Sequence, residues 1–254
     1  NSINVIGDIH GCNTALKEYV DKIGGINKSD GNFYIFCGDY IDRGIENAEV
    51  VKYLCSIRDY DNVLMLEGNH ERWLWIWAND GVCPSKEFEF HTKYELDNAK
   101  IDKKEVRKLY RRMGQCAWFD YNGKEFFISH GGISSLPPII TTIATQQLIK
   151  GVGNYNDFEL VEQRWDENTG SDCYQIHAHR NTKNVPIHAS DRNYNLEGRV
   201  EFGGDLRAVT RAGCACVRRH CVERPKLLLL LIGEGKLILA EAVDQYFLYL
   251  FHDG

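Results

Sequence analysis

The sequence predicts an α/β domain built on a largely parallel sheet with helices on its faces. The first observation is an alternation of short apolar runs with segments of helical periodicity, over 3–8, 13–25, 33–39, 47–60 and 62–71. This order of strand, helix, strand, helix, strand is typical of a parallel sheet, because each crossover helix returns the chain to the same edge. The second observation is the length of 254 residues, 43% of them hydrophobic. This is enough for one full-sized core and not clearly enough for two.

The individual elements follow from local patterns. The first helical segment places Leu16, Val20 and Ile23 on one face, and Gly24 is a stop signal at its end. Between the two halves of the chain, the charged segment 87–112 favours helix and predicts an insert or cap. Further strand-like runs follow at 125–132, 173–181 and 199–209.

Composition excludes several classes of protein. The net charge of -6 gives no global basic field of the kind that attracts nucleic acid. The longest apolar run, 227–232, is far shorter than the ~20 residues of a membrane-spanning helix. The first residues lack the basic region and apolar core of a signal peptide. Nine cysteines, mostly inside apolar runs, indicate reduced thiols and a cytoplasmic chain.

Polar side chains and glycines follow the predicted strands, in "GDIHG", "GDYIDRG", "GNHE", "SHGG" and "HAHRN". Ligand sites of open α/β sheets lie beyond the carboxyl ends of the strands, so these loops are expected to converge. They offer oxygen and imidazole donors that suit Mn²⁺, Fe or Zn²⁺. Two ions ~3.5–4 Å apart need a bridging carboxylate, for which Asp39 on a central strand is best placed. The candidate metal ligands are Asp8, His10, Asp39, Asn69, His130 and His179.

These motifs, in this order, resemble those of the calcineurin-like metallophosphoesterase superfamily, and more narrowly its phosphoprotein-phosphatase branch of bacterial and phage type. The resemblance implies a four-layer α/β/β/α sandwich with mixed central sheets. It also implies a catalytic domain over 1–212, with 87–112 as a helical insert. The remaining segment, 213–254, is predicted to be an extension packed on the same domain.

The resemblance also implies a role for each motif residue. Asp8 and His10 would hold one of two divalent ions, Mn²⁺ being the first expectation, and Asp39 would bridge to the other. His70 would be the general acid that protonates the leaving oxygen, with Asp42 orienting it. Arg43 would grip the phosphoryl oxygens, together with Asn69. A hydroxide bridging the two ions would then attack phosphorus in line.

Two assignments have alternatives. The last metal ligand is either His177 or His179, and the small residue before it favours His179, with His177 packed nearby. A second phosphate-binding arginine is expected at Arg164, for which a surface position is the alternative; Arg72 is a further candidate.

Two segments fall outside the motifs. The run "ERWLWIWAND" carries three tryptophans, which predict a core-facing stripe, with base stacking as an alternative use. In the tail, the spacing of Cys214, Cys216, His220 and Cys221 departs from the paired pattern of zinc sites, so thiols are favoured over a metal site.

The leading functional expectation is a metal-dependent phosphatase that acts on phosphoserine or phosphothreonine proteins. The alternatives are a phosphatase for RNA ends and a hydrolase of dinucleoside polyphosphates. Asp42 counts against the second alternative, because the resemblance implies that those hydrolases typically lack this aspartate. An inactive binding module is the least expected, because every motif position is filled. The sequence lacks the eukaryotic "SAPNY" signature, so no obligate partner is expected and a monomer is the default. The expected partner is thus the substrate, a phosphoprotein or a phosphorylated nucleotide or RNA end.

Overall fold

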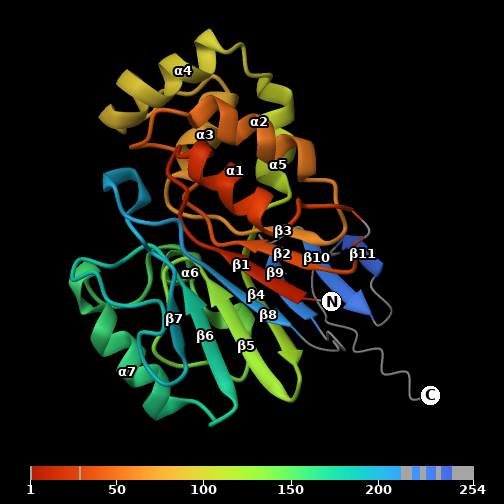
Figure 1. The fold of residues 1–254 in the computed structure, drawn as a ribbon, viewed down its shortest axis with the longest axis vertical. Helices are drawn as coiled ribbons and strands as arrows, with labels where there is room; N and C mark the ends of the chain where they lie inside the picture. The colour runs from red at the N-terminus through yellow and green to blue at the C-terminus, as the bar shows by residue number, and fades with distance from the viewer. Residues whose placement is uncertain (1, 29, 213–218, 224–226, 233–235, 242–254) are drawn as a thin grey trace.

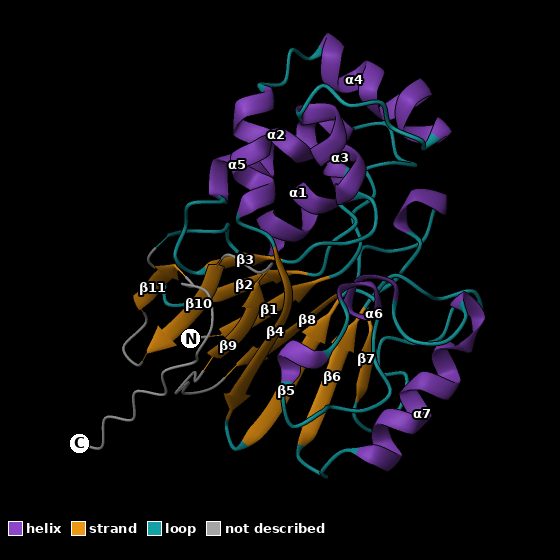
Figure 2. Ribbon diagram, turned by 180° about the vertical axis from the view of Figure 1, so that it is seen from behind, coloured by secondary structure: helices purple, strands orange, loops and turns teal. Residues whose placement is uncertain are grey.

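The computed structural model describes residues 2–28, 30–212, 219–223, 227–232 and 236–241. Two β-sheets pack face to face, and helices cover the outer face of each (Figure 1). The arrangement is the expected four-layer α/β/β/α sandwich. Figure 2 shows the same layers from behind, with α1 to α5 on one side of the strands and α6 and α7 on the other.

The first sheet has the strand order β3, β2, β1, β8. Its strands are β1 (Ser2–Ile6), β2 (Phe33–Phe36), β3 (Val63–Met65) and β8 (Ala208–Ala212). Strands β1, β2 and β3 run parallel, which confirms the order predicted from the sequence, and β8 adds an antiparallel edge. The helices between them are α1 (Asn13–Lys22) and α2 (Asn47–Ile57).

The second sheet has the strand order β11, β10, β9, β4, β5, β6, β7. Its described strands are β4 (Gly114–Tyr121), β5 (Lys124–Ser129), β6 (Cys173–His177), β7 (Asn193–Asn195), β9 (Arg219–Glu223), β10 (Leu227–Ile232) and β11 (Lys236–Glu241). Strands β5, β6 and β7 are parallel, whereas β9 pairs antiparallel with β4. Part of the tail thus extends this sheet, while Cys214 and Cys216 lie outside the described residues.

Three hydrophobic clusters hold the layers together. Ile6, Leu54 and Leu74 belong to the cluster between the first sheet and its helices. Val5 and Ile128 belong to the cluster between the two sheets. On the far side, the second sheet packs against α6 (Thr145–Lys150) and α7 (Phe158–Asn168), where Phe127 stacks on Trp165 at 5.9 Å between ring centroids. Strands β1 to β6 are therefore buried between these clusters, and their ends are fixed in position.

The segment predicted as an insert is helical. It contains a π-helical turn (Phe88–Thr92), α4 (Lys93–Asn98) and α5 (Lys103–Arg111), which pack on α2 and on α3 (Glu71–Ala78). Trp77 of α3 is buried and donates its indole N–H to Asp97 of α4 at 3.0 Å. None of the helices in the described ranges is long and apolar enough to cross a membrane.

The strand-like run predicted over 199–209 is a strand only at its end, where β8 begins at Ala208. Arg199 and Gly203 adopt left-handed backbone conformations, with φ of 56° and 83°, and they flank a 3₁₀ turn at Val200–Phe202. The alternation of apolar and polar residues in this stretch imitates a strand, but these two positions fold the chain back before β8 begins. Strands β4 and β7 and helices α6 and α7 were not predicted from the sequence.

Candidate active site

The loops that follow β1, β2, β3, β5, β6 and β7 meet at one end of the sandwich. Each parallel strand delivers polar side chains at its carboxyl end, as the rule for open α/β sheets predicts. The side chains of Asp8, His10, Asp39, His130 and Glu197 are buried there. Groups of titratable side chains that could hold a metal ion form around Asp39 and around Asp8.

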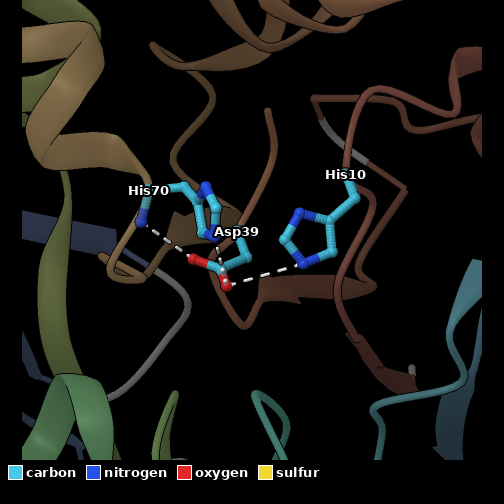
Figure 3. Close-up of side chains that lie close together, drawn as sticks. All are labelled: His10, Asp39 and His70. Carbon is cyan, nitrogen blue, oxygen red and sulfur yellow. Dashed lines mark hydrogen bonds and ion pairs between the residues drawn. The ribbon is translucent and has the colours of Figure 1, made fainter. Parts of the chain in front are cut away.

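One carboxylate oxygen, Oδ2 of Asp39, is surrounded by histidine rings. The Nε2 atoms of His130, His10 and His70 lie 3.1, 3.6 and 3.9 Å from it. Nδ1 of His179 lies 4.0 Å away. Figure 3 shows the rings of His10 and His70 directed at the carboxylate, which also accepts a hydrogen bond from the His70 backbone N–H at 3.1 Å. Although burial opposes ionisation, His130 and His70 hold the pKa of Asp39 well below its ordinary value.

Two histidines beside Asp39, His10 and His130, are hydrogen-bonded through Nδ1, so Nε2 of each ring is the atom that could bind a cation. Nδ1 of His130 donates to the carbonyl oxygen of Cys37 at 2.9 Å, and Nδ1 of His10 donates to that of Ile41 at 3.1 Å. In each ring Nε2 then faces Asp39. Although burial opposes it, the charge of Asp39 raises the pKa of His130, so a cation at this position would displace the proton of that ring. Burial lowers the pKa of His10 and, with His130 nearby, brings the pKa of His179 to about 4. Both rings are therefore neutral at pH 7, the form that binds metal ions.

Glu197 is a site residue that the sequence reasoning missed. It follows the three-residue strand β7 and hydrogen-bonds Asp8, and with His10 these two form a possible metal-binding group. Burial and this second carboxylate raise the pKa of Asp8 well above its ordinary value, because two buried acids side by side need a proton or a cation between them. The signal was present in the sequence, since Glu197 and Gly198 repeat the pattern of a polar residue and a glycine after a strand.

Glu71, the last residue of "GNHE", is a second missed residue. Its carboxylate is fully buried and accepts backbone N–H groups of Asp39 at 2.9 Å, Tyr40 at 2.8 Å and Gly68 at 2.7 Å. Burial and the Asp39 charge raise the pKa of Glu71 to about 7. Glu71 ties the loop after β2 to the loop after β3, so it positions Asp39 relative to Asn69 and His70.

His70 and Asp42 form a buried pair. Nδ1 of His70 donates to Oδ2 of Asp42 at 2.6 Å, and the other carboxylate oxygen accepts from the Thr92 hydroxyl. Burial alone would lower the pKa of His70, but the charges of Asp39 and Asp42 outweigh it and raise the pKa to about 9. Thr92 lies in the π-helical turn of the insert, so the insert contributes directly to the orientation of Asp42.

Arg43 lies at the edge of the cluster and has a protein partner. Its Nη1 donates to Oε1 of Glu201 at 2.8 Å and to Nε2 of His10 at 3.0 Å. The Arg43 side chain is 27% exposed, so it is accessible to an incoming anion. Glu201 was not singled out in the sequence, because it lies in the stretch that was taken for a strand.

The two histidines of "HAHRN" have separate environments. His177 is buried and donates from Nε2 to Glu162 of α7 at 2.8 Å, away from Asp39. His179 joins His130 and Asp39, and its backbone N–H donates to Asp8 at 3.0 Å. The choice of His179 over His177 thus agrees with their positions.

The structure does not bring Arg164 to the cluster. Residues of α7 such as Val161, Glu162 and Trp165 face the sheet, and helical periodicity places Arg164 on the opposite, solvent-facing side. Its side chain is 56% exposed, and its guanidinium pairs with Glu167 at 2.6 Å. Arg164 thus lies at the surface, the alternative position that the sequence left open.

The residues of the cluster fit a pair of cations. Buried polar atoms remain without a hydrogen-bond partner, among them Oδ1 of Asn69, Oδ1 of Asp8 and Nδ1 of His179. Space for close approach comes from glycines: a Cβ at Gly38 would lie 2.5 Å from the Gly68 nitrogen, and one at Gly68 would lie 2.2 Å from Oδ1 of Asp39. Non-glycine residues of the site adopt left-handed backbone conformations, with φ of 42° at His10, 50° at Asp39 and 68° at His179. Such strain is typical of functional sites.

Comparison with known proteins identifies the family. A family model described as calcineurin-like phosphoesterase matches residues 2–210. The chain belongs to this family. It is therefore a hydrolase of the metallophosphoesterase family, which uses a dinuclear metal site, and its buried aspartate and histidine groups supply side chains that could bind the metals.

Curated relatives of this calcineurin-like phosphoesterase include nucleotide hydrolases. It is 24% identical over 220 residues to the asymmetrical bis(5'-nucleosyl)-tetraphosphatase PrpE of Halalkalibacterium halodurans, covering 81% of this chain and 88% of the relative. It is 27% identical over 224 residues to the protein of the same name from a Geobacillus species, covering 81% and 89%.

Solved structures share the fold at lower identity. A protein provisionally assigned as a diadenosine tetraphosphatase has a TM-score of 0.58 and 15% identity, covering 87% of this phosphoesterase and 93% of that chain. A serine/threonine phosphatase from Saccharomyces cerevisiae with similarity to human phosphatase PP5 has a TM-score of 0.56 and 15% identity, covering 96% and 81%. At this identity the likeness shows the fold alone.

Proposed function

We propose that this phosphoesterase hydrolyses dinucleoside tetraphosphates asymmetrically. The observation that carries the proposal is its similarity, over 81% of its length, to curated tetraphosphatases of two organisms. The buried cluster around Asp39 supports it, since it brings together side chains that could hold the metal ions of a phosphate hydrolase. The sequence-based preference for a protein phosphatase is thereby replaced. Asp42 disfavours tetraphosphate hydrolysis in the family resemblance, but the similarity to these curated tetraphosphatases outweighs it.

The chain's own side chains would hold the cations in two groups that share Asp39. Asp8 and His10, joined by Glu197, would hold one ion; Asn69, His130 and His179 would hold the other. When bound, such ions polarise the phosphate and activate the attacking water. Oxygen and imidazole ligands suit Mn²⁺, and they also accept Fe or Zn²⁺. Arg43 would contact the phosphoryl oxygens through the part of its guanidinium that Glu201 leaves open.

His70 would deliver a proton to the leaving oxygen. Its raised pKa, about 9, keeps the ring protonated at pH 7, and Asp42 fixes its orientation. Cations at Asp39 would lower the pKa of His70, because they neutralise one of the charges that raise it. Asp42 lies on the opposite side of the ring and would keep its effect.

The His70–Asp42 pair also favours a second function, hydrolysis of phosphoserine or phosphothreonine esters. An alkoxide leaving group is strongly basic and needs a proton from a general acid, whereas a nucleotide phosphate leaves with little help. A buried, well-oriented acid is therefore of more use for an alkyl phosphate. Removal of phosphate from RNA ends makes the same demand on His70.

A panel of substrates decides between these functions. Initial rates with Mn²⁺ are compared for diadenosine tetraphosphate, a phosphoserine peptide and an RNA oligonucleotide with a 3′-phosphate. The proposal predicts the highest kcat/KM for diadenosine tetraphosphate, with unequal products, ATP and AMP. A higher kcat/KM for the phosphopeptide would restore the second function, and equal products would contradict asymmetric cleavage.

A further inference from the structure

A groove opens beside the candidate active site. Its volume is about 520 Å³, within the usual range of small-molecule sites. Gly68 and Asn69, from the loop that leads to His70, belong to its lining. Helix α3 lines one side, and α6 lines another. A substrate whose phosphate reaches the Asp39 cluster would therefore extend naturally into this groove.

The tryptophans of α3 divide between the core and this groove. Trp77 shares the buried helix face with Leu74, as the sequence predicted. Trp73 and Trp75 are only partly buried and line the groove. Trp75 is held in place because it stacks on Tyr110 of the insert, with 4.8 Å between ring centroids and 18° between planes. Trp73 and Trp75 thus pack partly against the core and leave the rest of their aromatic surface in the groove.

Positively charged side chains and an amide also line the groove. Arg72 and Lys150 are exposed at the groove, and the Arg72 guanidinium lies 5.9 Å from the centre of the Trp73 ring. The acid in the lining, Glu67, is buried and accepts a hydrogen bond from the Tyr110 hydroxyl at 2.8 Å. The accessible charge of the groove is therefore positive. The amide of Gln146 is also exposed there and can bond the edge of a ligand.

We propose that the groove binds one nucleoside of the substrate, with the base on the Trp73 and Trp75 wall and the phosphates between Arg72 and Lys150. The inference rests on the proposed function and adds the part of the protein that recognises the nucleotide. A nucleotide combines a flat base with an anionic chain, which matches aromatic rings beside cations. A phosphopeptide has the anion without an obligatory flat group, so the aromatic wall favours the nucleotide.

The first test compares two substrates in the Mn²⁺-loaded protein. Diadenosine tetraphosphate carries bases, and p-nitrophenyl phosphate carries none. In Trp73→Ala the ratio of kcat/KM for the first to kcat/KM for the second falls roughly 5- to 150-fold, the range expected for loss of base stacking. Trp73→Phe retains most of the ratio because it keeps an aromatic ring. Tyr94→Ala, which removes an exposed aromatic residue of α4 outside the groove lining, leaves the ratio unchanged.

An unchanged ratio in Trp73→Ala would overturn the inference. If Trp73→Ala loses both activities through misfolding, the exposed Arg72→Glu carries the test. Reversing this charge lowers the same ratio because the tetraphosphate chain is more anionic than p-nitrophenyl phosphate, and an unchanged ratio there would overturn the inference.

The second test measures binding without turnover. Quenching of tryptophan fluorescence by ATP is recorded in metal-free protein, with inorganic triphosphate as the ligand that lacks a base. The inference predicts quenching by ATP that weakens in Trp73→Ala and is much smaller with triphosphate; equal effects of the two ligands would contradict it. If ATP binds in this way but diadenosine tetraphosphate is not hydrolysed, the proposed function fails and the groove assignment stands. If diadenosine tetraphosphate is hydrolysed with no dependence on Trp73, the groove assignment fails and the proposed function stands.

Discussion

Replacing Asp42 by asparagine removes one charge from the buried pair with His70 and keeps the shape of the side chain. The Asp42 carboxylate lies 2.6 Å from Nδ1 of His70 and is fully buried. A charge at this distance changes a histidine pKa by about 1–3 units. The pKa of His70, about 9 in the native protein, should therefore fall to between about 6 and about 8 in Asp42→Asn. At pH 8 the protonated fraction of His70 then drops by about 2- to 100-fold.

The assay is the pH dependence of kcat for two aryl phosphates that differ in leaving group. Because the pKa of His70 is raised, its acid form is present below about pH 9 and is lost as the pH rises through that value. Asp42→Asn should move this alkaline limb to lower pH for phenyl phosphate, whose leaving group is basic. It should have little effect on p-nitrophenyl phosphate, whose leaving group needs no proton. Cations at Asp39 lower the pKa in both proteins, so the difference between them remains.

Asp97→Asn is the matched control for this experiment, because Asp97 is exposed on α4 and bonds Trp77 instead of a site residue. Its profile should match that of the native protein. An alkaline limb at the same pH in Asp42→Asn and the native protein would show that Asp42 does not raise the pKa of His70. Equal losses with both substrates would show that His70 does not protonate the leaving group.

Three further predictions test other parts of the site. Glu71→Gln leaves at least one buried backbone N–H unpaired, which costs about 1–3 kcal/mol and lowers Tm by about 2–12 °C in a thermal melt; an unchanged Tm would contradict the role of Glu71. Arg43→Ala lowers kcat/KM for p-nitrophenyl phosphate by about 10- to 100-fold, whereas Arg164→Ala has no effect, and equal losses would contradict the placement of the two arginines. Gly68→Ala places a methyl group against Asp39 and reduces the Mn²⁺ bound per chain, as measured by elemental analysis; native Mn²⁺ content would argue against a tightly fitted site.

Much of the site could be predicted because it obeys a simple spatial rule. Asp8, Asp39 and His130 each follow a predicted strand, and parallel strands bring their carboxyl ends to one edge. The rule holds however far apart the residues lie in the sequence. The rule also applies to Glu197, but the strand before it has only three residues and no apolar run, so its strand was not recognised.

The supporting contacts could not be predicted in the same way. Thr92 reaches Asp42 across fifty positions of sequence because the insert packs on α2 and α3, and no local pattern encodes that packing. Glu71 looks like an ordinary acidic residue in the first turn of a helix, where acids are favoured in any case. Only its burial against three backbone N–H groups reveals that it joins two loops. The position of Arg164 depended on which face of α7 meets the sheet, and that helix was not predicted.

Asp39 belongs to two groups of side chains that could hold a metal ion, so we expect it to be shared by two cations. The most direct measurement is the number of Mn²⁺ ions per chain, by elemental analysis after loading and desalting, in the native protein and in Asp39→Asn. We expect two ions in the native protein and fewer than one in the variant, with loss of p-nitrophenyl phosphate hydrolysis. Asp97→Asn should retain both ions. An Asp39→Asn variant that keeps two ions and native activity would rule out Asp39 as a ligand shared by two cations.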